Sequence, residues 1–225
     1  LLRCEQLNGK KPWSEAWIMG YGLDEKGMKM SKSKGNAIDP LPVIEQFGAD
    51  TFRFWSASEI NHGYDFRCNE QKIESTKKFL SKLWNVSRFL SSFPVIESGI
   101  PMATDKWILL ELDNLIKECK KGYDEYNFFI PAIAIREFTW NLFAAHYIEM
   151  VKARAYGIGF TDEERDGAIY TLHKTLSTIL KLLAPITPFI TEYLWKTLYS
   201  SESIHRQHQA TSELGESQSK ITKEI

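Results

Sequence analysis

The sequence predicts a mainly α-helical protein, because apolar residues recur at helical spacing and helix-start signals precede each run. From residue 69 onward, apolar residues lie three and four positions apart, which is the spacing of one buried helix face. Asn69 is a good helix cap, Thr161 with Glu164 forms a capping pair, and Thr187 precedes a proline. Strand-like patterns occur only before residue 69, so a short α/β region is expected ahead of a helical bundle.

The start of the chain contains the strand signals. Residues 17–23 are largely apolar and residues 28–30 follow after a turn that ends in Gly27, which suggests two strands joined as a hairpin. A further short strand is expected through Phe66.

Two short helices are predicted between these strands. Asp39 followed by a proline is a plausible helix start, and Gly48 ends that helix. Asp50 is expected to cap the next helix, over residues 51–58.

Five longer helices are predicted after residue 68, followed by a polar tail or linker over 201–225. They are expected from Asn69 to Phe93, Thr104 to Gly122, Pro131 to Gly157, Thr161 to Pro185, and Pro188 to Tyr199. The third is apolar on more than one side and therefore belongs in the middle of the bundle. Several bundle aromatics are expected to be core residues rather than base-stacking platforms: Trp84, Phe89, Trp140, Phe143 and Trp195.

Charge and composition narrow the function classes. The chain has 28 basic and 29 acidic residues, so its net charge of −1 excludes a general polyanion binder and any nucleic-acid contact must come from local clusters. No apolar run approaches the roughly 20 residues of a membrane span, and a cytoplasmic location is expected. The three cysteines are odd in number and far apart, which argues against disulfides and zinc, and His205 and His208 lack further ligands, so no metal site is expected.

The eight residues 29–36, KMSKSKGN, are the strongest chemical signal. They combine three lysines, two serines and a glycine: Lys29, Lys32, Lys34, Ser31, Ser33 and Gly35. Ammonium groups neutralise phosphate oxygens, hydroxyls donate hydrogen bonds, and glycine permits close approach of the backbone. The order differs from that of the Walker loop. A phosphate-binding loop is therefore one interpretation, and a solvated lysine-rich loop is the other.

The string KMSKSKGN resembles the extended KMSKS signature of class I aminoacyl-tRNA synthetases. The similarity continues in DPLPVIEQFGADTFRFW after the loop, in KLWNVSRFL at 82–90, in HYIEMVKARAY at 146–156 and in LLAPITPFITEYLW at 182–195. These motifs are typical of the valine, isoleucine and leucine subgroup. KLWNVSRF is most similar to the valyl enzymes, with the isoleucyl enzymes as the alternative.

The resemblance implies a domain organisation. Residues 1–36 would be the end of a Rossmann-type catalytic domain with the KMSKS loop, and residues 37–68 a connector. Residues 69–200 would be an anticodon-binding α-helical bundle, and 201–225 the polar tail.

The resemblance also implies roles for the loop. Lys29 and Lys32 would reach the triphosphate of ATP, which binds with Mg²⁺, while the carboxylate of valine attacks the α-phosphate to form valyl-AMP. Ser31 and Ser33 would orient the loop or bond phosphate oxygens, and Gly35 would let it swing. Charge develops on the departing pyrophosphate, where a lysine lowers the barrier electrostatically.

The bundle would bind the anticodon stem of a valine-accepting tRNA, with cations on its phosphates. The candidates are Lys77, Lys78, Lys82, Arg88, Arg136, Lys152 and Arg154. For each one alone, a solvated or intrahelical charge is the competing interpretation. The HIGH motif of the family is missing, so the 225-residue chain alone is expected to be inactive. A non-catalytic tRNA-binding helical module is the alternative from another class.

Overall fold

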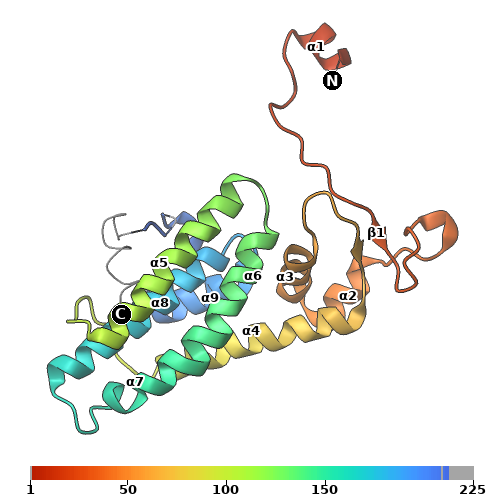
Figure 1. The fold of residues 1–225 in the computed structure, drawn as a ribbon. Coiled ribbons are helices and arrows are strands. Elements are labelled where there is room, and N and C mark those ends of the chain that lie inside the picture. Colours follow the sequence, from red (N-terminus) through yellow and green to blue (C-terminus); the bar gives the residue numbers. More distant parts are fainter. Residues whose placement is uncertain (1, 209, 213–225) are drawn as a thin grey trace, which may run out of the picture.

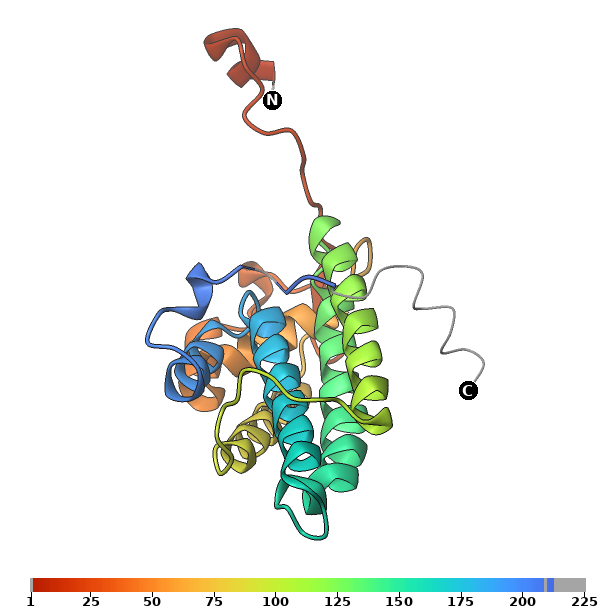
Figure 2. The same ribbon diagram turned by 90° about the vertical axis from the view of Figure 1, so that its left-hand side faces the viewer.

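The protein has a bundle of long helices and a smaller part built from short elements, with an extended N-terminal segment leading into the latter (Figures 1 and 2). The structure is a computed structural model that describes residues 2–208 and 210–212. A short helix, α1 (Leu2–Asn8), lies at the far end of the extended segment. The predicted mainly α-helical class is confirmed.

Long helices build the bundle. They are α4 (Glu70–Leu90), α5 (Ala103–Asp124), α6 (Phe129–Glu137), the π-helix η2 (Phe138–Tyr147), α7 (Ile148–Ala155), α8 (Asp162–Leu183) and α9 (Pro188–Leu198), with a 3₁₀ turn, η3 (Ile204–Arg206), after them. The elements α6, η2 and α7 follow each other without a break, so the helix predicted over 131–157 is one helix with a π-helical middle.

The predicted helix starts at Asn69 and Thr161 are confirmed. The side chain of Asn69 accepts a hydrogen bond from the Lys72 amide at 3.2 Å. The Thr161 hydroxyl accepts from the amide of Glu164, and the Glu164 carboxylate accepts from the Thr161 amide at 2.9 Å. Both patterns satisfy amide groups that the first helical turn leaves without partners.

The smaller part contains two very short strands and two short helices. The strands β1 (Gly22–Leu23) and β2 (Phe66–Arg67) pair in parallel, and α2 (Pro40–Phe47) and α3 (Ala49–Glu59) lie between them in sequence. The predicted hairpin is reduced to one antiparallel bridge, between Leu23 and Lys29. The ladder partner of β1 is instead β2, because Phe66 and Cys68 donate their amides to carbonyls on either side of Gly22.

The predicted cap of α3 was wrong. Its N-cap is Gly48, and Asp50 lies in the first turn with its carboxylate directed at the start of α9. That carboxylate accepts the Ile190 amide at 2.6 Å and the Phe189 amide at 3.4 Å, and burial raises the pKa of Asp50. Asp50 thus caps a helix that begins 138 positions later, since Pro188 opens α9. Helix-start residues identify capping chemistry but not which helix end receives it.

Arg53 adds a second link at the same corner. Its Nε donates to the Ile186 carbonyl at 2.9 Å and its Nη2 to the Pro185 carbonyl at 3.0 Å, in the turn between α8 and α9. The next residue, Phe54, is fully buried in the main core of the bundle, with its ring 4.7 Å from that of Phe79. Helix α3 is therefore fixed to the bundle by both polar and apolar contacts.

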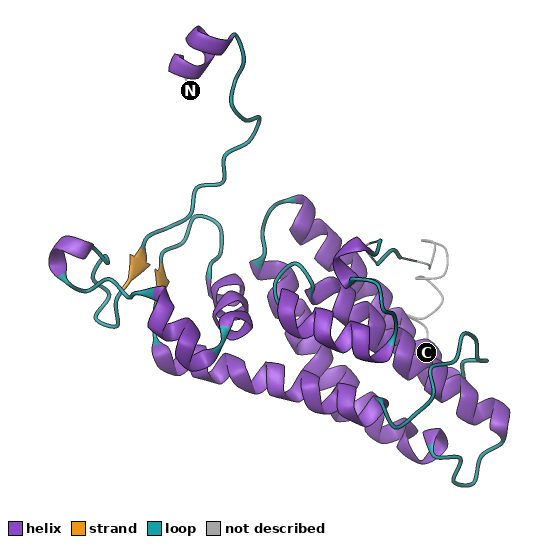
Figure 3. Ribbon diagram, turned by 180° about the vertical axis from the view of Figure 1, so that it is seen from behind, coloured by secondary structure: helices purple, strands orange, loops and turns teal. Residues whose placement is uncertain are grey.

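A separate small core holds the rest of the smaller part together. Its buried members are Val43, Trp55, Cys68 and Ile73, and Met30, the second residue of the KMSKSKGN segment, packs against them. Ile73 belongs to α4, so this long helix runs from the small core into the bundle (Figure 3). The two cores share an uninterrupted helical connection.

A buried ion pair joins the ends of two bundle helices. Both nitrogens Nη1 and Nη2 of Arg154 donate to the Asp105 carboxylate, and the Tyr147 hydroxyl donates to the same group at 2.6 Å. Asp105 is completely buried and Arg154 is 4 % exposed. Although burial opposes its charge, the hydrogen bond to Asp105 raises the pKa of Arg154. Asp105 also accepts the Met102 amide, so it serves the start of α5 as well.

The chain after α9 is anchored by Glu192 as far as Arg206. Ile204 is buried, although it lies in the segment expected to be a polar tail or linker. The Glu192 carboxylate accepts the Ile204 amide at 2.9 Å and the Ser203 hydroxyl at 3.0 Å. Most of the predicted tail, residues 209 and 213–225, lies outside the described residues. Within the described part of the chain, no helix has the length and apolarity needed to cross a membrane.

The buried ion pair gives a stability prediction. Asp105→Ala leaves the Arg154 guanidinium buried without its counter-ion, which is expected to lower the free energy of unfolding by about 3–5 kcal/mol. Asp124→Ala is the matched control on the same helix, since its ion pair with Lys120 is exposed and should contribute about 0–1 kcal/mol. Urea unfolding followed by circular dichroism measures both, and equal losses would contradict the structural role of Asp105.

The anchored segment gives a pH prediction. Hydrogen bonding to Lys196 and to residues 203 and 204 lowers the pKa of Glu192 from 4.5 to about 2. Because the folded-state pKa is lowered, this carboxylate stabilises the docked segment above pH 4.5 and loses that effect as the pH falls towards 2. The protection of the Ile204 amide against hydrogen exchange, measured relative to its intrinsic exchange rate at each pH, should therefore fall over this pH range. In Glu192→Gln this loss of protection should be absent; the same fall in that variant as in the parent protein would contradict the assignment.

Candidate functional site

Residues 29–36 form an exposed loop beyond the strands, on the side of the smaller part that faces away from the bundle (Figure 3). The loop begins after the Leu23–Lys29 bridge, and Ser31 is extended. One 3₁₀ turn, η1 (Lys32–Lys34), follows, and Gly35 closes it with its amide donating to the Lys32 carbonyl at 3.2 Å. Gly35 has φ +68°, in the left-handed region that favours glycine.

The three loop lysines carry uncompensated charge at the surface. Lys29, Lys32 and Lys34 are exposed, and no ion pair holds any of them within the described residues. The ammonium of Lys29 lies 3.5 Å from the centroid of the Tyr21 ring, which is a cation–π contact. The hydroxyls of Ser31 and Ser33 are 2.6 Å apart and share one hydrogen bond. The loop therefore presents several cations and hydroxyls to solvent at one place, as a phosphate-binding segment needs.

Asn36, the last residue of the string, makes the contacts that organise the loop. Its Oδ1 accepts the Ser31 amide at 2.9 Å, and its Nδ2 donates to Asp24 at 2.9 Å and to the Lys29 carbonyl at 3.3 Å. Asp24 also accepts the amides of Lys26 and Met28. The hydrogen bond from Asn36, followed by that from Met28, lowers the pKa of Asp24. The sequence analysis assigned no role to either side chain. The features that could have pointed to them are that Asp24 begins the turn and that Asn36 ends the motif.

The candidate cations of the bundle occupy two neighbouring helices. Lys77, Lys78 and Arg88 are exposed on α4, whereas Lys82 is half-buried with its ammonium 5.8 Å from the Trp140 ring. Lys152 on α7 lies at 5.8 Å from the Phe89 ring of α4 and pairs with Glu149 at 3.7 Å.

Two of the candidates have other partners. Arg136, on α6, pairs with Glu137 at 3.6 Å. Arg154 is not at the surface at all: its guanidinium is engaged by Asp105, so its charge is a structural one and it leaves the set of RNA-contacting candidates.

The aromatic residues of the bundle divide into two groups. Phe143 and Trp195 are buried and Phe89 is half-buried, as expected for core residues. The expectation was wrong for Trp84 and Trp140, which are 41 % and 39 % exposed. Both lie on outward helix positions; the Trp84 ring stacks on that of Tyr193, 5.5 Å away between centroids. The spacing of apolar residues did not distinguish these two exposed tryptophans from core residues, because each stands among apolar residues of its helix.

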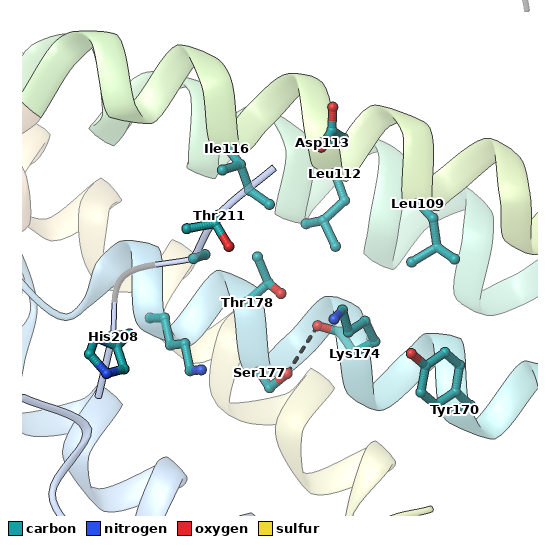
Figure 4. Close-up of a pocket in the computed structure, with 12 residues that line it drawn as sticks. Leu109, Leu112, Asp113, Ile116, Tyr170, Lys174, Ser177, Thr178, His208 and Thr211 are labelled. Atoms are coloured by element: carbon teal, nitrogen blue, oxygen red, sulfur yellow. Dashed lines mark hydrogen bonds between the residues drawn. The ribbon is translucent and has the colours of Figure 1, made fainter. Parts of the chain in front are cut away.

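A half-open pocket of about 360 Å³ lies at the bundle rather than at the loop. It is bordered by Leu112 and Ile116 of α5, by Lys174 and Thr178 of α8, and by the segment at His208 (Figure 4). None of the loop residues lines it, so the candidate phosphate site is an open surface loop and not a closed pocket. Among residues 2–208 and 210–212, no group of three or more His, Cys, Asp and Glu side chains is placed to hold a metal ion.

Two family models match the chain. The model described as tRNA synthetases class I (I, L, M and V) matches residues 1–69, and the anticodon-binding domain of tRNA ligase matches residues 105–225. The valine–tRNA ligase of Aeropyrum pernix is 45 % identical over 92 % of the chain, and that of Pyrobaculum aerophilum is 46 % identical over 91 %. In each case the chain spans 26 % of the relative's length.

The fold has a counterpart among solved structures. The LeuRS of Agrobacterium radiobacter K84, solved in a ternary complex with tRNA and LeuAMS, superposes with a TM-score of 0.72 at 21 % identity, over 94 % of this chain and 26 % of that one. At this identity the likeness concerns the fold alone. The two matching family models, of which the anticodon-binding model covers residues 105–225, show that the chain belongs to the class I tRNA synthetase family and contains the anticodon-binding domain of tRNA ligases.

Proposed function

We propose that the chain is part of a valine–tRNA ligase, to which it contributes the KMSKS loop and the anticodon-binding bundle. The identity of 45 % and 46 % to valine–tRNA ligases across more than nine-tenths of the chain carries the proposal. These relatives favour valine over the isoleucine alternative. The whole ligase would form valyl-AMP and pyrophosphate from valine and ATP, with Mg²⁺, and then transfer valine to its tRNA. We propose the cytoplasm as its location.

The exposed loop suits the first of these steps. In it, a valine carboxylate oxygen forms a bond to the α-phosphorus of ATP while the bond to pyrophosphate breaks, leaving valyl-AMP. Negative charge grows on the departing pyrophosphate, and preorganised cations at that position lower the barrier. We assign Lys29 and Lys32 to the triphosphate, because both are exposed and free of carboxylate partners within the described residues.

The remaining loop residues would shape this contact. Ser31 and Ser33 already share a hydrogen bond, and either hydroxyl could donate to a phosphate oxygen instead. Gly35 supplies the left-handed turn that keeps the loop compact. Before ATP binds, Lys29 rests on the Tyr21 ring, and a phosphate would compete with that ring for its ammonium.

The bundle would bind the anticodon stem of a valine-accepting tRNA. We retain Lys77, Lys78, Lys82, Arg88 and Lys152 as candidates, together with Arg136. Lys82 and Lys152 each lie over an aromatic ring that bridges α4 to the helix formed by η2 and α7, so these cations sit along one helix–helix boundary. Such a boundary offers cations at fixed spacing to an RNA backbone.

The loop assignment predicts the behaviour of Lys32→Ala in the whole ligase. Because this lysine would act on charge that grows in the transition state, ATP–pyrophosphate exchange is expected to slow by about a hundredfold to a thousandfold. Valine binding should be unchanged. Lys26→Ala is the control, since Lys26 is an exposed lysine in the preceding turn. Equal losses of exchange and of valine affinity would contradict the assignment.

The bundle assignment predicts that removing phosphate-contacting cations makes tRNA binding less dependent on salt. If Lys78 and Arg88 contact phosphates, Lys78→Gln with Arg88→Gln should weaken binding and reduce the slope of log affinity against log salt by about one to two. Filter binding at several salt concentrations measures the slope. Lys120→Gln, at an exposed position of α5, is the control and should leave the slope unchanged. An unaltered slope in the double variant would exclude these two residues.

A further inference from the structure

The side chain of Asn36 joins three points of the chain that flank the loop lysines. Its carbonyl oxygen holds the Ser31 amide, one residue before Lys32. Its amide nitrogen holds both the Lys29 carbonyl and the Asp24 carboxylate. A single half-buried side chain at the end of the loop therefore fixes the loop's beginning and its middle.

Asp24 is the fixed end of this arrangement. Its Oδ1 accepts the Met28 amide at 2.8 Å and the Lys26 amide at 3.0 Å, which closes the turn that ends in Gly27. Its Oδ2 is left for Asn36 at 2.9 Å. Backbone hydrogen bonds between Asp24 and Met28 and between Gly22 and Met30 also hold this turn. Met30 itself packs on the small core. Asn36 thereby connects the segment with the exposed cations to a turn that is anchored on the small core.

The contacts restrain the backbone while leaving the cations able to move. The Lys29 carbonyl is held by Asn36, but its ammonium lies on the exposed Tyr21 ring and makes no ion pair within the described residues. Lys32 is exposed directly after the restrained Ser31 amide. A loop of this kind loses little further backbone freedom when its lysines meet a phosphate.

We propose that Asn36 and Asp24 are positioning residues for adenylate formation: their hydrogen bond holds the loop so that Lys29 and Lys32 meet the triphosphate. The inference rests on the function proposed above and extends it to two side chains that touch no reacting atom. Because the proposed role belongs to the hydrogen bond between these two side chains, its donor, its acceptor and their charges can be changed without changing the lysines.

Three variants of the whole ligase isolate this hydrogen bond. Asn36→Ala removes the donor and acceptor, and ATP–pyrophosphate exchange is expected to slow on the order of tenfold. Asn36→Asp cannot donate and places a second carboxylate against Asp24, so a loss of about a hundredfold is expected. The exchange KM for valine should not change in either.

The reciprocal variant Asp24→Asn with Asn36→Asp exchanges the two groups. The amide at position 24 donates to the carboxylate at position 36, which still accepts the Ser31 amide, while the carbonyl at position 24 still accepts the amides of Lys26 and Met28. Only the donor to the Lys29 carbonyl is lost. Exchange is therefore expected to recover to within about tenfold of the parent enzyme. A reciprocal variant as slow as Asn36→Asp, or Asn36→Asp no slower than Asn36→Ala, would overturn the proposal.

A second background separates positioning from general stability. If Asn36 acts through Lys32, Asn36→Asp should cost much less in Lys32→Ala than in the parent enzyme, because coupled residues are not additive. The full hundredfold cost in both backgrounds overturns the proposal. Asn141→Ala removes an exposed side-chain amide of η2 that, among the described residues, bonds to Glu137, and this variant should leave exchange unchanged.

The same series distinguishes this inference from the function on which it rests. Normal exchange in Lys32→Ala would overturn the proposed function itself. A loss in Lys32→Ala with no recovery in the reciprocal variant would overturn the positioning role alone. Binding of tRNA, which involves the bundle and not the loop, should be the same in all variants; its loss would show that the substitutions disturb the fold and would overturn a local role for Asn36.

Discussion

The hydrogen bonds from helix α3 to the turn between α8 and α9 are the constraint on which the arrangement of the smaller part and the bundle depends. Asp50 caps α9, and Arg53 satisfies the carbonyls of Pro185 and Ile186. Those carbonyls lie where a proline prevents the helix from continuing, so without Arg53 they would need water as a partner. One turn of α3 thereby supplies the missing hydrogen bonds of a helix break far away in sequence.

Apolar contacts of α3 with both the main core and the small core add to these hydrogen bonds. Phe54 enters the main core while its neighbour Trp55 enters the small core, so adjacent residues of one helix belong to two different clusters. Helix α4 repeats the pattern over a greater length, with Ile73 in the small core and Leu83 in the main one. The cationic loop is consequently carried on the same rigid unit as the bundle, rather than on a hinge between them.

Local signals explain how much of the fold the sequence could predict. Asn69, Thr161 and Pro188 specify helix starts through chemistry within a few residues, and these were correct. Partners distant in sequence were not predictable in the same way: the β1–β2 ladder, the role of Asp50, and the burial of Arg154 all depend on segments more than 40 residues apart.

The candidate site follows the same division. The lysines and serines of the loop are residue types that bind phosphate, so the sequence alone identified them as candidates. Asn36 and Asp24 have no distinctive composition, and only their geometry reveals what they contact. Among the bundle cations, charge alone could not distinguish the exposed Arg88 from the buried Arg154, because both have apolar residues beside them in a helical sequence.

The π-helical stretch at 138–147 has a consequence for how this family can vary in length. There the amide of Ile148 donates to the carbonyl of Phe143, five residues back instead of four, so the stretch contains more residues per turn than the helix around it. Removing one residue there would return the stretch to α-helical winding, and because the wide turn absorbs the change, the helix after it would keep its orientation. Arg154 would still meet Asp105. In the α-helical parts around the stretch, removing a residue would instead rotate everything after it by about 100° and turn Arg154 away from Asp105. A change of one residue in length should therefore be tolerated within the π-helical stretch before it is tolerated elsewhere in this helix.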